Sequence, residues 1–353
     1  MESNARTKSV NANVNVNRIC TITLITLFTL LIDMSAMVIL APDAYAASGS
    51  VKINKKNFPN KHFREYVKKN FDKNNNGKLS RSEITQIKKI SGSSLKGYRG
   101  VKVTTFKGIE HFTELEVLKA SDAFVKKLNL KKNKKLRVLN FQSSKITSLD
   151  LSKNTKLEKI DVTSNLELKT LKLGDNPALK KLDCSFTELT SLDVSKAPAL
   201  IDLFVIDCKM KAIDVTKNPD LEALAVNANK IKAIDVSKNP KLLCLDCTDN
   251  SIQTLDIRNN PELVRLECQK NKLKELDISA NTKLKAVLCD GNNLSKLDIS
   301  NCPLLKEAYR GAKWIWYEGT DREYYQYTDG ENYNVYNCDL LYVDPDTEII
   351  AAD

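Results

Sequence analysis

The stretch Leu242–Glu262 reads LLCLDCTDNSIQTLDIRNNPE, and it decides the fold. Apolar side chains occupy positions 1, 4, 6, 11, 14 and 16 of this unit, and asparagine occupies position 9. Leu245, Asp246 and Cys247 alternate between apolar and polar, which is typical of a short strand with one buried face. The unit therefore predicts a strand followed by a corner, a return segment and a second corner.

The same unit recurs along the chain, and leucine stands at position 1 of every copy. Successive leucines keep a 21-residue period except for a single 22-residue step; they are Leu115, Leu136, Leu157, Leu179, Leu200, Leu221, Leu242, Leu263, Leu284 and Leu305. A single unit cannot bury its own apolar residues, so neighbouring coils must stack at roughly 4.8 Å, the spacing between strands. The prediction is a parallel leucine-rich repeat solenoid of about ten coils over residues 93–305, with few helices.

Polar residues at fixed positions predict how each coil turns. The position-9 asparagines are expected to turn inward and bond backbone groups at the first corner; they are Asn165, Asn229, Asn250, Asn271 and Asn292. The aspartates at position 15 either accept hydrogen bonds from the backbone two residues on or hold a line of calcium ions. They are Asp150, Asp193, Asp214, Asp235, Asp256, Asp277 and Asp298.

Nine cysteines raise the question of a disulfide or metal site. Four of them occupy the inward position 6, where thiols act as small apolar groups; they are Cys184, Cys247, Cys268 and Cys289. Cys244 and Cys247 form a CxxC pattern, but they point to opposite faces of one strand, which argues against a metal or redox site. Cys302 and Cys338 either bridge the last coil to the tail or stay as free thiols.

Ligand recognition is expected on the outward strand positions 3, 5 and 7. Phe204 and Ile206 are both predicted to face solvent on one strand, and an exposed aromatic beside charges is a plausible binding anchor. The alternative is that Phe204 packs on a neighbouring side chain. The candidate surface comprises Asp183, Asp202, Phe204, Ile206, Asp246 and Arg265.

Residues 47–92 predict a helical cap with a calcium loop. Residues 72–83 read DKNNNGKLSRSE and fit the EF-hand pattern D-x-N-x-N-G-x5-E. The expected Ca²⁺ ligands, with Lys78 acting through its carbonyl, are Asp72, Asn74, Asn76, Lys78, Ser80 and Glu83. Ile84, Ile87 and Ile90 are expected on one face of the exit helix. The alternative is a loop that only covers the first coil.

The two ends of the chain read differently from the repeats. Residues 1–46 carry basic residues, an apolar stretch and Ala44-Tyr45-Ala46, the pattern of a cleaved secretion signal. Residues 306–353 are rich in tyrosine and hold both tryptophans. Within them Glu323–Tyr336 predicts a hairpin that caps the open edge of the last coil, and carbohydrate contact is the alternative.

The net charge of +11 is unevenly placed, and the excess of lysine and arginine lies in residues 47–110. A uniform nucleic-acid-binding face is therefore not indicated. These basic residues either contact anionic wall polymers or keep the cap solvated. No HExxH, Gly-x-Ser-x-Gly or phosphate-loop pattern is present, so no catalytic activity is expected.

The pattern LxxLxCxxNxLxxLDVSxNP, as in residues 242–261, resembles the cysteine-bearing 21-residue repeats of secreted and surface proteins of Gram-positive bacteria, of which the internalins are the best known. The resemblance covers about residues 111–305 and implies binding of macromolecules, usually host or cell-surface proteins, without catalysis. The lone EF-hand loop is similar to those that precede repeats in some bacterial secreted proteins. A Leu-Pro-x-Thr-Gly sorting motif is not seen, which leaves anchoring to the wall open.

These features predict an exported, monomeric binding protein whose strand face recognises an extracellular protein or glycan. Binding of nucleic acid and insertion into the membrane after signal cleavage are not expected. The alternative is a structural component of the cell envelope that the basic N-terminal module holds to anionic wall polymers.

Overall fold

The structure is a computed structural model that describes residues 49–92, 95, 103–311 and 340–352. The predicted secretion signal, the predicted hairpin and Cys338 lie outside the described residues. No helix in the described ranges is long and apolar enough to cross a membrane.

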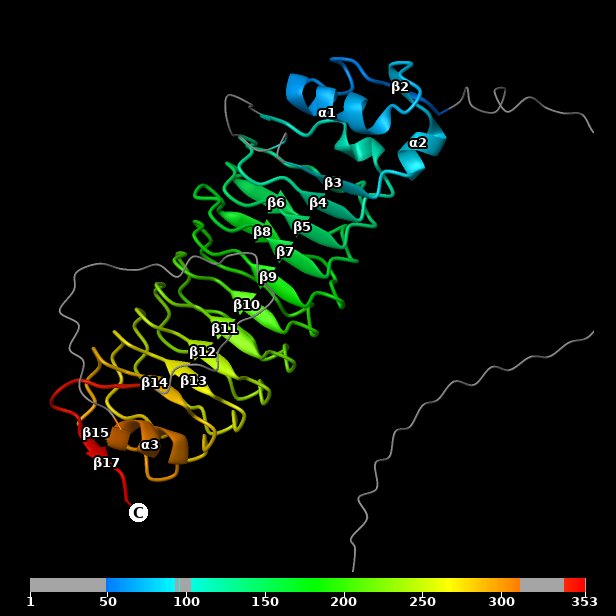
Figure 1. Ribbon diagram of the computed structural model, residues 1–353. Coiled ribbons are helices and arrows are strands. Elements are labelled where there is room, and N and C mark those ends of the chain that lie inside the picture. Colours follow the sequence, from blue (N-terminus) through cyan, green and yellow to red (C-terminus); the bar gives the residue numbers. More distant parts are fainter. Residues whose placement is uncertain (1–48, 93–94, 96–102, 312–339, 353) are drawn as a thin grey trace, which may run out of the picture. The chain divides into compact units, whose positions relative to one another are not determined.

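One parallel sheet runs through the repeats, and each coil contributes one short strand to it (Figure 1). Its strands follow the sequence order with one-to-one register, so that Leu203 lies between Leu182 and Leu224. The strands are β3 (Lys89–Ser91), β4 (Val117–Lys119), β5 (Val138–Asn140), β7 (Lys159–Asp161), β9 (Lys181–Asp183), β10 (Asp202–Phe204), β11 (Ala223–Ala225), β12 (Cys244–Asp246), β13 (Arg265–Glu267), β14 (Ala286–Leu288) and β16 (Leu340–Tyr342). The predicted leucine-rich repeat solenoid is confirmed.

The inward positions of all coils meet in one continuous core. Leu245 at position 4 and Cys247 at position 6 are at most 1% exposed, and their counterparts in the other coils are buried as well. Each buried leucine contributes about 1.5–3 kcal/mol through loss of apolar surface from water. Because each coil shares this core only with its neighbours, the stack holds together coil by coil.

The corner after each strand combines a left-handed residue with an asparagine. Position 8 has a positive φ in nine successive coils, although only Gly291 is a glycine; the others are Asp122, Ser143, Ser164, Phe186, Asp207, Ala228, Asp249 and Lys270. At position 9, Asn250 donates from Nδ2 to the carbonyls of Val226 and Cys247, both at 3.0 Å. The inward-turned asparagine predicted from the sequence is confirmed.

The return side of the coils is mostly irregular. Asp235 Oδ1 accepts the backbone N–H of Ser237 at 2.9 Å, and the same turn recurs at Asp150, Asp193, Asp214, Asp256, Asp277 and Asp298. The predicted backbone turn at these aspartates is thus confirmed. Strands form on this side at β6 (Ser148–Asp150) with β8 (Thr170–Lys172) and at β15 (Lys296–Asp298) with β17 (Glu348–Ile350).

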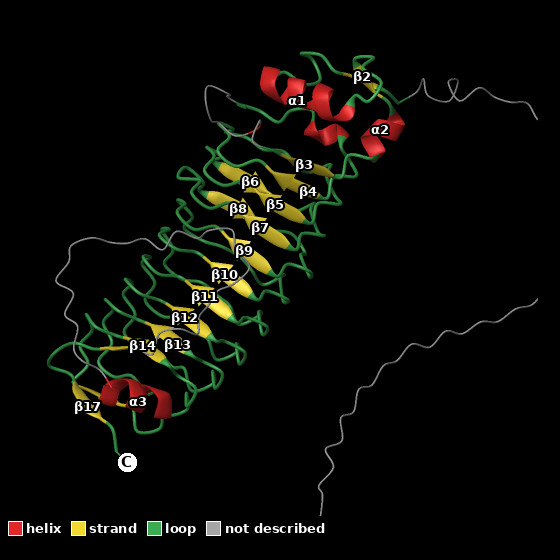
Figure 2. Cartoon of the chain, in the orientation of Figure 1, coloured by secondary structure: helices red, strands yellow, loops and turns green. Residues whose placement is uncertain are grey.

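The tenth coil is interrupted by a helix. Leu305, the last position-1 leucine, lies in α3 (Pro303–Gly311), and the strand of its coil arrives only at β16, which pairs with β14. The described part of the tail therefore extends the solenoid instead of only covering it. Figure 2 shows the helices before the first coil and after the ninth.

The N-terminal module contains β1 (Val51–Lys52), α1 (Lys61–Phe71), β2 (Lys78–Leu79), α2 (Arg81–Thr85) and, just before the first coil, the turn η3 (Ile109–His111). The predicted exit helix is wrong in extent, because α2 ends at Thr85 and Ile90 belongs to β3. The carbonyl of Lys88 accepts N–H groups from Glu116 and Val117, which draws this segment into the sheet. Tyr66 Oη donates to the Ser91 carbonyl at 3.0 Å and ties α1 to the same strand.

Candidate binding surfaces

The outward face of the sheet carries an ordered row of side chains at position 5. Two carboxylates, Asp161 and Asp183, are followed by Phe204 and Ala225 on the next two strands. Two further carboxylates, Asp246 and Glu267, stand on β12 and β13, each in register with its neighbours. The row thus places an apolar shelf, Phe204 and Ala225, between two carboxylate pairs.

The expectation that Phe204 faces solvent is wrong, because its side chain is only 2% exposed. The Lys181 ammonium lies 5.1 Å from the centre of the Phe204 ring. A cation over an aromatic face is attracted by the ring, and the aliphatic stem of the lysine covers apolar surface. The alternative stated from the sequence, packing on a neighbouring side chain, describes this residue.

Three other predicted residues gather around the shelf. Asp202 forms an ion pair with Lys181 at 3.3 Å, and Ile206 stays partly exposed two residues beyond Phe204. Burial raises the pKa of Asp183, and the negative charge of Asp161 raises it further, although hydrogen bonds from Ser185 and Thr163 oppose both effects. The shelf is therefore bordered by carboxylates that are poorly solvated.

The second carboxylate pair is joined to a cation. Arg265 donates from Nε to Glu267 Oε1 at 2.6 Å. Burial, and then the charge of Glu267, raises the pKa of Asp246 to about 7. Asp246 accepts the backbone N–H of Thr248 at 3.0 Å, which holds its carboxylate in place. Of the predicted surface residues, Asp183, Asp202 and Phe204 lie together, whereas Asp246 and Arg265 lie two and three strands further along the sheet from Phe204.

Side-chain oxygens of the predicted calcium loop accept hydrogen bonds from the backbone of the same loop. Asp72 is 3% exposed and accepts N–H groups from Asn76 and Gly77 at 3.1 and 2.9 Å. Glu83 accepts N–H groups from Lys73 and Ser80, both at 2.8 Å. Carboxylates from both ends of the loop are thus tied to its backbone.

The side chains of this loop suit a hard cation. Burial raises the pKa of Glu83, but the hydrogen bonds from Ser80 and Lys73 outweigh it and hold that pKa below its usual range, so the group is ionised at neutral pH. The carboxamide oxygens of Asn74 and Asn76 each accept one backbone N–H of the loop. Oxygen donors are the ligands that Ca²⁺ prefers. Among the described residues no group of three or more His, Cys, Asp or Glu side chains is placed to hold a metal. The predicted loop itself offers two carboxylates, Asp72 and Glu83.

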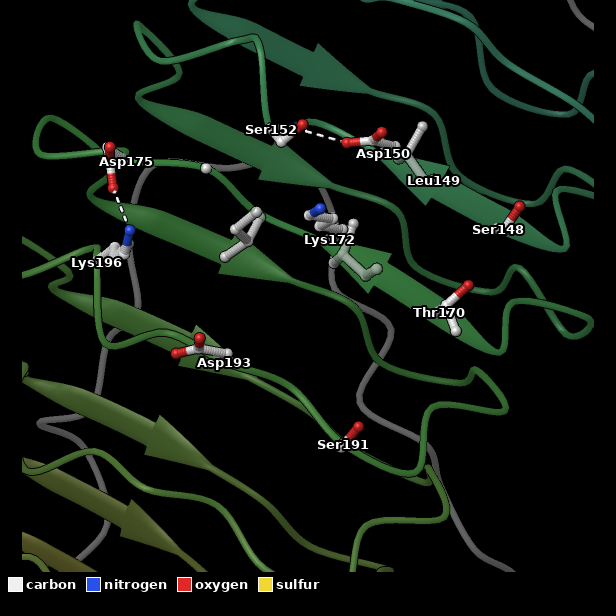
Figure 3. A pocket seen from close by; sticks show the side chains of 13 residues that line it. Ser148, Leu149, Asp150, Ser152, Thr170, Lys172, Asp175, Ser191, Asp193 and Lys196 are labelled. Carbon is white, nitrogen blue, oxygen red and sulfur yellow. Dashed lines mark hydrogen bonds and ion pairs between the residues drawn. The ribbon is translucent and has the colours of Figure 1, made fainter.

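A groove on the return side was not predicted from the sequence. It has a volume of about 770 Å³ and lies between β6, β8 and the segment from Ser191 to Lys196 (Figure 3). Its lining is rich in hydroxyl and charged groups. The sequence did carry a signal, since the groove coincides with the 22-residue coil and with Lys172 at the position that holds aspartate in the adjoining coils.

The described cysteines are free, and most of them are buried. Burial raises the pKa of Cys247 far above its ordinary value, so this thiol stays protonated. Cys302 is fully buried, and its Sγ lies 3.6 Å from the Asn281 carbonyl. The four position-6 thiols, such as that of Cys247, act as core side chains, as the sequence pattern predicts, and Cys302 is buried at a corner position instead.

Comparison with known proteins places the fold. No protein-family model and no curated protein matches the sequence. An internalin, InlF from Listeria monocytogenes, is similar with a TM-score of 0.51 and 20% identity, over 74% of this chain and 82% of that one. The functional domain of InlJ from Listeria monocytogenes, which includes a cysteine ladder, has a TM-score of 0.46 and 22% identity, over 72% of this chain and 69% of that one.

The parallel sheet, the 21-residue period and the asparagine corners define a leucine-rich repeat protein. Its solenoid is internalin-like in fold.

Proposed function

We propose that the chain is an exported, non-catalytic binding protein that recognises another protein with the outward face of its sheet. The observation that carries the proposal is the position-5 row, in which the shelf of Phe204 and Ala225 lies between carboxylate pairs. The core requires only the inward positions, so the pattern on the outward face is free to serve recognition. Phe204 and Ala225 are themselves buried, so this face offers a partner the two carboxylate pairs and the partly exposed Ile206. Apolar and charged groups side by side are typical of a protein interface.

The buried carboxylates on the outward face indicate the charge of the partner. Asp183 and Asp246 have raised pKa values because they are poorly solvated. A cationic partner side chain placed beside them would relieve this cost and form charge-assisted hydrogen bonds. The proposed partner is therefore a protein surface with basic residues that meet the two carboxylate pairs and a small apolar contact for Ile206.

Site-specific cross-linking tests this proposal. A photoreactive residue at Ile206 should capture specific partners from a display library of extracellular protein domains. The same residue at Thr254, which is exposed on the return side, should not. Asp183→Lys or Asp246→Lys should lower the affinity for a captured partner about 10-fold or more, whereas Asp256→Lys on the return side should leave that affinity unchanged. Equal capture from both positions, or an unchanged affinity in the strand-face variants, would refute recognition by this face.

The calcium loop is a second element of the proposed function. Asp72 and Glu83 would hold the ion together with oxygens of Asn74, Asn76, Ser80 and the Lys78 carbonyl. With two carboxylates only, the affinity should lie in the extracellular range, a Kd of about 10⁻⁴–10⁻³ M. Because α1 is bonded to β3 through Tyr66, a bound ion would brace the first strand of the solenoid.

Calcium titration with thermal unfolding tests the loop. At about 10 mM Ca²⁺ the stability should rise by about 1.4–2.7 kcal/mol, from mass action at that affinity. Glu83→Gln should abolish the effect, and Glu65→Gln, an exposed member of an ion pair on α1, should retain it. An equal response of Glu83→Gln and the parent protein, or no response in either, would rule out this site.

The basic N-terminal module supports a further candidate function, retention on anionic wall polymers. Its lysines are largely exposed, and those of residues 49–92 form two ion pairs in the described structure, Lys61 with Glu65 at 3.9 Å and Lys88 with Glu116 at 3.6 Å. A surface of this kind binds polyanions in a salt-dependent manner. Co-sedimentation with teichoic acid that persists after Lys55, Lys56, Lys68 and Lys69 are changed to glutamine would contradict it.

A further inference from the structure

The groove on the return side lies where the repeat departs from its own pattern. The coil that begins at Leu157 is the 22-residue unit, and Lys172 stands in register with Asp150 of the preceding coil. Asp193 occupies the same position in the following coil, so one lysine interrupts the row of aspartates. Nothing in the core requires this substitution, because the Lys172 side chain is exposed.

The charged groups around the groove fall into two classes (Figure 3). Asp150 is paired with Lys131 at 3.0 Å, and Asp175 is paired with Lys196 at 2.9 Å. Lys172 has no ion-pair partner in the part of the chain that the structure describes. Asp193 accepts the backbone N–H of Ser195 and forms no ion pair among the described residues. With Lys131 included, three carboxylates and three ammonium groups surround the groove, and the charges of Lys172 and Asp193 are available to a ligand.

Hydroxyl groups line the groove at regular intervals. Ser148, Thr170 and Ser191 each stand just before the return-side leucine of successive coils, and all three are exposed. With coils stacked at about 4.8 Å, the three hydroxyls span roughly 10 Å. Leu173, which is half-buried, adds an apolar surface to the lining.

We propose that this groove binds a neutral oligosaccharide. Sugar hydroxyls both donate and accept hydrogen bonds, which matches hydroxyl side chains alternating with an ammonium and carboxylates. The C–H face of a sugar ring packs on aliphatic surface such as Leu173. A polyanion would meet as many acidic as basic groups here, which disfavours an anionic ligand. The length of the hydroxyl row is comparable to a disaccharide.

A printed array of neutral and anionic oligosaccharides, followed by calorimetry with each neutral sugar that binds, tests the proposal. Lys172→Asp restores the aspartate of the neighbouring coils and should fold normally, and it should lower the affinity about 10-fold or more. Lys238→Asp makes the same charge change on an exposed lysine outside the groove and should leave the affinity within about 2-fold. Thr170→Ala with Ser191→Ala should also weaken binding.

Three results would overturn the proposal. Binding to no neutral oligosaccharide would remove the ligand class, and a preference for anionic sugars would make Lys172 an anion site instead. An equal loss in Lys172→Asp and Lys238→Asp would place the ligand elsewhere. The strand-face variant Asp246→Lys should leave sugar binding unchanged, so failure of this proposal is separable from failure of the strand-face function.

Discussion

Ala197 breaks the second asparagine ladder of the solenoid, and replacing it should stabilise the protein. Position 19 is a fully buried asparagine in the coils on either side. Asn239, for example, donates from Nδ2 to the carbonyls of Val215 and Asn218 at 3.0 and 2.8 Å. Alanine offers no such donor, so the matching carbonyls of the preceding coil, those of Leu173 and Asn176, receive no ladder amide in the described structure.

The magnitude follows from the two hydrogen bonds that Ala197→Asn would add. The backbone at this position already matches its neighbours, since Ala197 donates to the Val194 carbonyl at 3.0 Å, as Asn239 does to the Val236 carbonyl. Each new bond is worth about 0.5–1.5 kcal/mol. Ordering the side chain costs up to about 1 kcal/mol, and the carboxamide oxygen is buried without a partner in most ladder asparagines. The net gain should be about 1 kcal/mol, which raises Tm by about 2–4 °C in a domain of this size.

Thermal and urea unfolding of Ala197→Asn, monitored by circular dichroism, measures this gain. Asn239→Ala is the mirror-image variant and should lose about 1–3 kcal/mol, because it removes one donor from each of two buried carbonyls. The exposed Asn293→Ala serves as the control and should change little. If Asn239→Ala destabilises while Ala197→Asn has no effect or lowers Tm, the ladder geometry does not extend to residue 197 and the reasoning fails.

Three further outcomes are expected. Cys268→Val should keep the free energy of unfolding within about 1 kcal/mol of the parent, whereas Cys268→Ser should lower it by about 1–3 kcal/mol, because a buried hydroxyl needs a hydrogen-bond partner. Urea titration measures both variants, and equal losses would contradict an apolar role for the thiol. Ala228→Gly should gain about 0.5–1 kcal/mol by relieving the left-handed backbone at φ 54°, and a loss in the same assay would show that strain there is negligible. The raised pKa of Asp246 means that folding takes up a proton between about pH 4 and 7, so stability falls as pH rises through that interval. The free energy of unfolding of Asp246→Asn should therefore equal that of the parent at pH 4 and exceed it by about 1–2 kcal/mol at pH 8. This is less than the full pKa shift implies, because the carboxyl group is partly solvated. A difference that stays constant from pH 4 to pH 8 would contradict the titration of Asp246.

The sequence predicted the inward half of this molecule well, because burial imposes a strict period on it. Leucine at position 1 and a buried apolar residue at position 6, most often cysteine or valine, have the same physical role in successive coils. The asparagine corners were predictable for the same reason, since Asn250 and its counterparts bond backbone groups that every coil presents. A regular spacing therefore predicts which side chains are buried in the core.

The outward half was predicted less well, because alternation fixes the direction of a side chain and not its contacts. Phe204 does point out of the sheet, but Lys181 on the adjacent strand covers it. The extent of the tenth coil was not predicted, for a different reason. Leu305 satisfies the repeat, yet the strand of its coil is reached only at Leu341, and a pattern read within a fixed window cannot detect a unit divided by an insertion.

Residues that depart from the repeat are not required by the solenoid fold, so they are candidates for a role in binding. Lys172 and Ala197 both replace residues that would preserve the ladders, and Lys172 lies in the 22-residue coil while Ala197 lies in the next. Such changes weaken the return side of the stack, since Ala197 leaves two carbonyls without a ladder donor and Lys172 removes a backbone turn. A repeat protein can retain costly exceptions of this kind where they serve binding, as functional sites commonly do at the expense of stability. The double variant Lys172→Asp, Ala197→Asn should therefore have a higher Tm than the parent chain, and it should bind the sugar about 10-fold or more weakly.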